Sequence, residues 1–379
     1  MMTWPRIDWG TLSSKYGLLL VWALVAAGFC VFGPATFRTW SNVQTILGTQ
    51  SVILVLALGL CIALNAGEVD LSITGTMSVS VVLVGHLNVV KGWPIGLTVP
   101  VVLLLGLAIG AVIALFVVGI GIDSMIVTLG AGTLLSGVAV AINQQTVFNI
   151  SPDLVSAMRD QFLGLQLSFW YGVVLVAVLW FVLKFTPAGI HLRFVGSNRD
   201  ASRLTGIAVD RLRVASLMAC SGFSALAGVV IAGTLGSTSP TVSSPYLLPA
   251  FAAAFLGSTT IQPGRFNAVG TFAAVYFLTT GITGIQLMGA SGWVSNVFYG
   301  AAVMLAVAAS TVAGKMRRRR DVRDNTPQVD NTPQAGGATG LEPGTGPNPG
   351  SGTAEQVTTA PQHSPSTGPA PARSGLHSD

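Results

Sequence analysis

Two carboxylates in a short polar stretch between apolar segments are the groups best suited to do chemistry in this sequence. Residues 65–72 read Asn-Ala-Gly-Glu-Val-Asp-Leu-Ser. A carboxylate inside a membrane costs about 3 kcal/mol unless it faces a partner or water. One interpretation is a helix break that shapes a transport pathway or its inner gate. The other is a short solvated loop in which Asp70 or Ser72 caps the next helix. The candidate pathway residues in this stretch are Asn65, Gly67, Glu68, Asp70 and Ser72.

A second polar stretch, residues 187–213, holds five arginines against two aspartates and lies between apolar runs. Ser197 or Asn198 can cap a short helix within it. Asp200 then falls in the first turn, and Gly206 supplies a left-handed stop. A capped helix at the membrane surface is suited to receive force from a soluble partner. The candidate coupling residues are Gly196, Ser197, Asn198, Asp200, Ala201, Arg203 and Gly206.

Glycine and hydroxyl side chains follow a third segment, the apolar run that ends near residue 256. Gly257 and Thr259 are the candidate residues here, and Pro263-Gly264 comes shortly after them. One interpretation is a broken helix whose free backbone groups are satisfied by neighbouring side chains. The other is a plain tight turn at the Pro-Gly pair between two helices.

The rest of the sequence argues against catalysis by this chain. It contains no Gly-x-x-x-x-Gly-Lys-Ser/Thr motif for nucleotide phosphates, no His-Glu-x-x-His motif and no nucleophile elbow. Its three cysteines lie in apolar runs without pairing or metal-ligand spacing. We therefore expect no catalytic residue, no metal site and no cofactor bound by the chain itself.

The elements that must position these polar groups are apolar helices. Of 379 residues, 51% are hydrophobic and only 9% are charged, whereas about a quarter are charged in a soluble protein. The sequence therefore predicts an all-α, polytopic integral membrane protein with about ten transmembrane helices of about 20 residues each, some of them broken or re-entrant. The predicted spans are 17–33, 43–64, 73–90, 95–118, 125–143, 169–186, 212–235, 248–262, 267–288 and 293–313.

The distribution of lysine and arginine predicts that both termini lie in the cytoplasm, because the basic clusters 187–213 and 315–320 then share that side. The chain divides into a cytoplasmic N-terminal segment (1–16), a transmembrane domain (17–314) and a C-terminal segment (315–379). The last begins with the basic juxtamembrane cluster. It continues rich in Pro, Gly, Thr and Ser, which is typical of a disordered tail.

Three stretches together resemble one family, the membrane permease subunits of ribose-type (monosaccharide) ABC importers in the branched-chain/ribose permease group. These stretches are 67–72, 189–207 and 255–260, and the resemblance extends over residues 45–312. The sequence departs from the family pattern at Thr74, where glycine is usual, and at 262–265, which replaces further glycines of the third stretch. These departures leave the substrate open.

The resemblance implies a set of partners. ATP and magnesium bind to separate ATPase subunits, against which the helix at 197–206 sits. A periplasmic or lipid-anchored sugar-binding protein delivers the substrate, with the outer loop 144–168 as its expected contact. A second copy of the permease completes an alternating-access pathway in a bacterial plasma membrane, and no nucleic acid takes part. Hydroxyl and amide groups would line a sugar path, which adds Asn143 to the candidate pathway residues.

Two alternatives stay open at this point. An ABC permease for a nucleoside, an amino acid or a signalling furanose would have the same architecture. An ion-coupled secondary transporter would instead need carboxylates or histidines inside its spans, and such groups are almost absent from the predicted spans.

Overall fold

A computed structural model of the chain describes the backbone of residues 9–324 and the side chains of residues 16–308. The segments 1–8 and 325–379, which include most of the predicted tail, lie outside the described residues, as do the side chains of the basic cluster. The elements in chain order are α1 Trp9–Phe32, η1 Ala35–Arg38, α2 Trp40–Gly48, α3 Ser51–Asn65, α4 Ile73–Gly85, η2 His86–Val90, α5 Ile95–Ala114, η3 Leu115–Ile120, α6 Ser124–Ile142, β1 Val147–Phe148, α7 Pro152–Arg159, β2 Gln161–Phe162, β3 Leu165–Gln166, α8 Leu167–Phe185, α9 Pro187–Ser197, α10 Arg199–Leu204, α11 Val209–Leu235, β4 Ser237–Thr238, η4 Ser244–Tyr246, α12 Leu247–Gly257, α13 Ala268–Leu287 and α14 Trp293–Asp324.

Seven helical stretches among the described residues are long and apolar enough to cross a membrane. They are Trp40–Asn65, Ile73–Val90, Ile95–Ile120, Ser124–Ile142, Leu167–Phe185, Val209–Leu235 and Ala268–Leu287. Three shorter apolar helices, Tyr16–Phe32, Ser244–Gly257 and Trp293–Ala308, overlap the three remaining predicted spans. The chain is therefore mostly helical and polytopic. The count of ten crossings and the cytoplasmic placement of the termini stay predictions.

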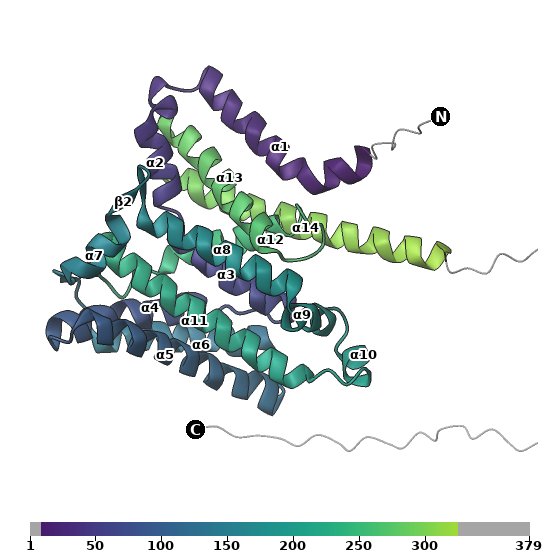
Figure 1. The fold of residues 1–379 in the computed structure, drawn as a ribbon, viewed down its shortest axis with the longest axis horizontal. Coiled ribbons are helices and arrows are strands. Elements are labelled where there is room, and N and C mark those ends of the chain that lie inside the picture. Colours follow the sequence, from purple (N-terminus) through teal and green to yellow (C-terminus); the bar gives the residue numbers. More distant parts are fainter. Residues whose placement is uncertain (1–8, 325–379) are drawn as a thin grey trace, which may run out of the picture. The chain divides into compact units, whose positions relative to one another are not determined.

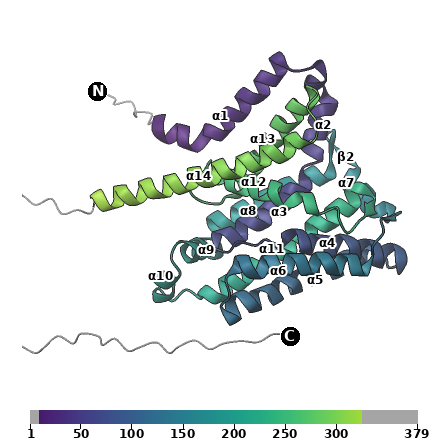
Figure 2. The same ribbon diagram turned by 180° about the vertical axis from the view of Figure 1, so that it is seen from behind.

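Helix α3 forms the centre of the helix bundle (Figures 1 and 2). Every residue of α3 except Ile62 is buried, and α8, α11, α12 and α13 pack around it. Helix α11 also packs along α5, where glycine permits a close approach. A Cβ added at Gly110 of α5 would lie 2.6 Å from the Cα of Met218 on α11. Small residues at such a crossing are typical of packed membrane helices.

The outer helices differ from α3 in burial, although they are just as apolar. In the α2–α3 span, 78% of the most apolar window is buried, whereas in the α6 span the value is 17%. Large side chains such as Leu104 on α5 and Ile126 on α6 are exposed. An apolar helix with an exposed apolar surface fits a lipid environment, because lipid tails are as apolar as the side chains that they contact.

The two ends of the bundle carry different irregular elements. The end with α9 and α10 is called the α10 end, and the end with α7, β1 and β4 is called the α7 end (Figure 1). At the α7 end, β1 pairs with β4 and β2 pairs with β3, both antiparallel. The all-α prediction contained no strands. These two-residue strands form because the polar loops there satisfy their backbone groups against each other.

Candidate functional site

The polar stretch 66–72 is a buried loop between α3 and α4. The side chain of Glu68 is 1% exposed and that of Asp70 is 0% exposed. The loop turns at Gly67, whose φ of 75° lies in the left-handed region that favours glycine. The interpretation of this stretch as a solvated loop is therefore wrong, because α6, α9 and α11 cover it. The helix-break interpretation describes its structure.

Helix α6 holds this loop through two hydroxyl groups. Ser124 Oγ accepts a hydrogen bond from the Val69 N–H at 3.3 Å, and Thr128 Oγ1 accepts one from the Leu71 N–H at 3.0 Å. Asp123 caps α6, since its Oδ1 accepts from the Met125 N–H at 2.9 Å. Thr128 is fully buried, and its hydroxyl holds the loop against α6.

Glu68 lies between two arginines from different elements. Its Oε1 is 2.8 Å from a terminal nitrogen of Arg199, on α10, and 2.5 Å from Nε of Arg213, on α11. Arg199 also donates to the Gly67 carbonyl oxygen at 3.0 Å. The Arg213 side chain is 11% exposed and that of Arg199 is 41% exposed. One buried carboxylate therefore joins the loop to both α10 and α11.

A second acid extends this cluster toward solvent. Asp210 lies 3.0 Å from Arg203 and 3.9 Å from Arg213. We call the five side chains Arg199, Arg203, Asp210, Arg213 and Glu68 the Glu68 network. Removing one partner of a buried ion pair destabilises a protein by about 3–5 kcal/mol, because it leaves a buried charge without compensation. The buried part of the network is therefore expected to hold these elements in one arrangement.

Asp70 has a local role at the start of α4. Its Oδ1 accepts hydrogen bonds from the Ser72 N–H at 2.9 Å and from the Ser72 hydroxyl at 2.5 Å. Burial raises the pKa of the Asp70 carboxyl, although the hydrogen bonds from Ser72 lower it. Ser72 is the N-cap residue of α4 but makes no side-chain capping bond. The predicted cap is thus replaced by an Asp70 turn that precedes the helix.

The 187–213 stretch folds into two short helices, α9 and α10, and the first residues of α11. Helix α9 begins after Thr186, whose hydroxyl accepts from the Gly189 N–H, and has Pro187 in its first turn. Helix α10 is capped by Asn198 and not by Ser197, because Asn198 Oδ1 accepts from the Ala201 N–H at 3.0 Å.

The features predicted for the short helix are otherwise present in α10. Asp200 lies in its first turn, and Gly206 follows it with a φ of 80°. Leu204, at the end of α10, is 90% exposed. This short helix therefore presents both charged and apolar side chains to its surroundings.

Helix α9 contacts the buried loop directly. A Cβ added at Gly196 would overlap the Asn65 carbonyl oxygen and lie 3.1 Å from the Gly67 nitrogen. Only glycine allows the two backbones to approach this closely. The candidate coupling residues and the candidate pathway residues, which are separate in the sequence, thus meet at the α10 end.

The segment that contains Gly257 and Thr259 also lies at the α10 end of the bundle. Helix α12 stops at Gly257, and the Asn267 side-chain amide donates to the carbonyl oxygens of Gly257, Thr260 and Arg265, each at 3.1 Å. The carbonyl groups that follow α12 are thus satisfied by a neighbouring side chain, which is one feature of the broken-helix interpretation. Thr259 Oγ1 bonds within the same turn, to the Leu256 carbonyl oxygen at 2.7 Å.

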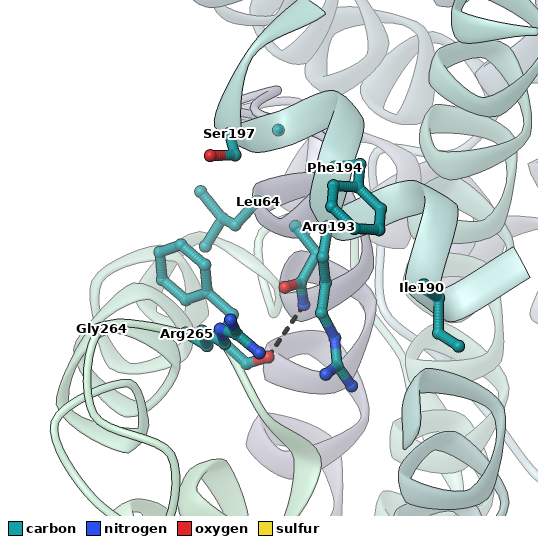
Figure 3. A pocket seen from close by; sticks show the side chains of 10 residues that line it. Leu64, Ile190, Arg193, Phe194, Ser197, Gly264 and Arg265 are labelled. Atoms are coloured by element: carbon teal, nitrogen blue, oxygen red, sulfur yellow. Dashed lines mark hydrogen bonds between the residues drawn. The ribbon is translucent and has the colours of Figure 1, made fainter. Parts of the chain in front are cut away.

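Asn65 joins this turn to the buried loop. Its side-chain amide donates to the Cys61 carbonyl oxygen at 2.7 Å and to the Phe266 carbonyl oxygen at 2.9 Å. A pocket of about 550 Å³ opens beside this contact (Figure 3). Its lining residues are Leu64, Asn65, Ile190, Arg193, Phe194, Gly196, Ser197, Gly264, Arg265 and Phe266.

Asn143, the remaining candidate pathway residue, does not lie at the α10 end with the others. It follows the last residue of α6, and at 1.5 Å per residue α6 is about 28 Å long. Ser124 at the start of α6 contacts the buried loop, so Asn143 lies at the α7 end. Its Oδ1 accepts from the Gln145 N–H at 3.2 Å, which is a local turn contact.

Four arginines of the site, Arg193, Arg199, Arg213 and Arg265, are not among the candidate residues predicted from the sequence. A carboxylate next to apolar spans needs a partner, and the sequence offers two basic clusters that are predicted to share its side of the membrane, 187–213 and 315–320. The particular pairing depends on how α10 and α11 pack, which the spacing of residues does not give.

Comparison with known proteins identifies the family to which this chain belongs. The family described as branched-chain amino acid transport system / permease component matches residues 42–308. The chain is 28% identical to the ribose import permease protein of Haemophilus influenzae over 284 residues, which covers 73% of this chain and 87% of that protein.

Two further relatives carry other names. The autoinducer 2 import system permease protein of Photorhabdus laumondii is 25% identical over 308 residues, covering 79% of this chain and 92% of that protein. The D-allose transport system permease protein of Escherichia coli K12 is 24% identical over 303 residues, covering 79% and 93%. No solved structure matches the chain.

Proposed function

The chain belongs to the permease family of ribose-type ABC importers, and from this premise we propose that it is the membrane-spanning subunit of an ATP-driven sugar importer. The relatives named for ribose and D-allose support a simple sugar as the substrate. The relative named for autoinducer 2 keeps a signalling furanose as the second candidate. In this proposal the chain itself hydrolyses nothing, and partner ATPase subunits bind ATP and magnesium.

The remaining arrangement follows from the predicted orientation. Ten helices cross a bacterial plasma membrane with both termini in the cytoplasm, and residues 315–379 form a basic anchor and a tail. The α10 end faces the ATPase subunits. The α7 end, with the loop 144–168, faces a soluble sugar-binding protein, and a second copy of the chain completes the pathway.

The observation that carries the coupling proposal is the position of Glu68 between Arg199 and Arg213. A force on α10 moves Arg199 relative to Glu68. Separating this pair would leave the buried carboxylate with Arg213 alone, at a cost of about 1 kcal/mol because the Arg199 side chain is 41% exposed. The loop 66–72 therefore moves with α10, and because the loop joins α3 to α4, movement at the membrane surface reaches the helices of the core.

Charge pairing also bears on the rival transporter class. A proton- or sodium-coupled carrier needs a buried carboxylate that is free to gain and lose a cation. Glu68 is instead neutralised by two arginines at the end of the helices. Glu68 therefore does not fit this role, but Asp70, which is buried and forms no ion pair among the described residues, is not neutralised in this way. Uptake with and without ATP separates the two classes.

Reconstitution tests the proposal. The chain would be placed in proteoliposomes with its ATPase and its binding protein, and uptake of labelled ribose and D-allose would be measured with and without ATP. We expect ATP-dependent uptake of one of these sugars, and at least a tenfold loss in Glu68→Gln while ATP hydrolysis continues. Asp123→Asn is the matched control, because Asp123 is an exposed carboxylate at the same end and asparagine also caps a helix.

Two results would contradict the proposal in different ways. Unchanged uptake in Glu68→Gln would show that coupling does not pass through this network. Uptake that needs no ATPase but follows an ion gradient would place the chain among secondary transporters.

A further inference from the structure

We propose that the pocket between α9 and the turn 258–267 binds the phosphate group of an anionic phospholipid. This inference requires only that the chain lies in a membrane, so it is independent of the transported substrate and of ATP coupling.

The charge of the pocket is the first argument. Arg193 comes from α9 and Arg265 from the 258–267 turn, and both side chains lie at the pocket (Figure 3). The lining residues include no acid. Among the described residues, neither arginine forms an ion pair. Two positive charges therefore share one pocket, and no acidic side chain of the described residues pairs with either of them.

The hydrogen bonding of Arg193 is the second argument for an anion in the pocket. One terminal nitrogen donates to the Leu183 carbonyl oxygen, which fixes the guanidinium beside the end of α8. Its Nε is buried and has no hydrogen-bond partner among the described residues. Burial and the neighbouring charge of Arg265 lower the pKa of Arg193. An anion in the pocket, beside the two guanidinium groups, would offset this repulsion.

The position of the pocket identifies the source of that anion. Helix α9 begins two residues after Phe185, where the α8 span ends. The Lys184 ammonium lies 5.1 Å from the ring centres of both Trp180 and Phe185. Tryptophan and lysine together at the end of a span are typical of the membrane–water interface. The pocket is therefore at the level where lipid headgroups lie.

The chemistry of the lining fits an amphipathic ligand. A guanidinium group can bind a phosphate through two parallel N–H···O hydrogen bonds, and Ser197 adds a hydroxyl donor. Ile190 and Phe194 line the same pocket and are 44% and 57% exposed, which offers an apolar surface to the acyl chains. Basic pockets of this kind between membrane helices bind anionic headgroups. A free carboxylate or phosphate would not need the apolar wall.

Lipid titration of the purified full-length chain tests the proposal. Native mass spectrometry in detergent would compare phosphatidylglycerol with phosphatidylcholine. We expect tighter binding of phosphatidylglycerol, weakened about fivefold in Arg265→Gln and about thirtyfold in the Arg193→Gln, Arg265→Gln double variant. Arg265→Lys, which keeps the charge, should retain most of the affinity. Arg211→Gln, an exposed arginine of the same end outside this pocket, should bind like the unmodified chain.

Three results would overturn the proposal. The first is equal affinity for the two lipids, or no loss of affinity in either Gln variant. The second is binding of inorganic phosphate, without anionic lipid, that matches phosphatidylglycerol in affinity, since this would assign the pocket to a free anion. The third is loss of ATPase-subunit binding in the double variant with lipid binding unchanged, since this would assign the pocket to a protein carboxylate. Arg265→Gln keeps the test valid if the double variant does not fold, because Arg265 is exposed.

Discussion

Different kinds of interaction hold the elements together at the α10 end and at the α7 end of the bundle. At the α10 end, ionic contacts join elements far apart in sequence, and Glu68 pairs with a residue 145 positions away. At the α7 end, the described residues form no ion pair, and hydrogen bonds join the elements, including one from Arg159 Nε to the Thr234 carbonyl oxygen at 2.7 Å. The β1 and β4 strands pair, and the Ser151 N–H donates to Asn88 Oδ1 at 2.9 Å.

This difference separates two tasks. The free energy of a partly buried charged cluster changes strongly when one of its side chains moves. Both the Coulomb energy and the desolvation of the charges depend on the distance between them. Neutral hydrogen bonds each contribute about 1 kcal/mol and lose little when a neighbour shifts. In our proposal, the α10 end transmits a displacement and the α7 end keeps a loop in shape.

The largest effect that tests this comparison is expected at Arg213. Arg213→Gln should lower the free energy of unfolding by about 3 kcal/mol, because its pair with Glu68 is almost fully buried. Arg199→Gln should cost about 1 kcal/mol, because its side chain is 41% exposed and solvent screens the pair. Thermal unfolding of the detergent-solubilised chain measures both. Arg211→Gln is the control and should change stability by less than about 0.5 kcal/mol. Equal losses at Arg213 and Arg199 would contradict the role assigned to burial.

A smaller effect is expected at the cap of α10. Asn198→Ala removes the acceptor of the Ala201 N–H, which costs about 1 kcal/mol. The loss should appear as faster hydrogen exchange in residues 199–204 and as a severalfold lower ATP-dependent uptake. Asn198→Asp should behave like the unmodified chain, because aspartate caps equally well. If Asp and Ala were equally damaging, the side chain would have a role other than capping.

The sequence was sufficient wherever a local rule decides the structure. The apolar runs, a cap at Ser197 or Asn198 and the Gly206 stop follow from residue types and spacing, and the structure selects Asn198 as the cap. The same rules would have given α9 its start, because Thr186-Pro187 is a cap followed by proline in the first turn.

The tertiary contacts of the site required the structure. Spacing does not reveal that Asn65 reaches the Phe266 carbonyl, 201 residues away. It also does not reveal which of five arginines would meet Glu68, because helix packing decides both. Burial of 66–72 depends on α6, α9 and α11 closing over it. A short polar loop next to membrane spans is as compatible with solvent as with a core until those neighbours are placed.

The smallest effect is expected at the α7 end, from Asn88→Ala. Asn88 accepts from the Ser151 N–H and donates to the Trp93 carbonyl oxygen, both at 2.9 Å. Its loss should lower the free energy of unfolding by about 1 kcal/mol, the contribution of neutral hydrogen bonds that water can partly replace. The number of sugar molecules transported per ATP hydrolysed should not change, because Asn88 contacts no part of the Glu68 network. Measuring uptake and ATP hydrolysis in the same vesicles separates these effects. A changed ratio would mean that the α7 end takes part in coupling, and the division of tasks between the two ends would then be wrong.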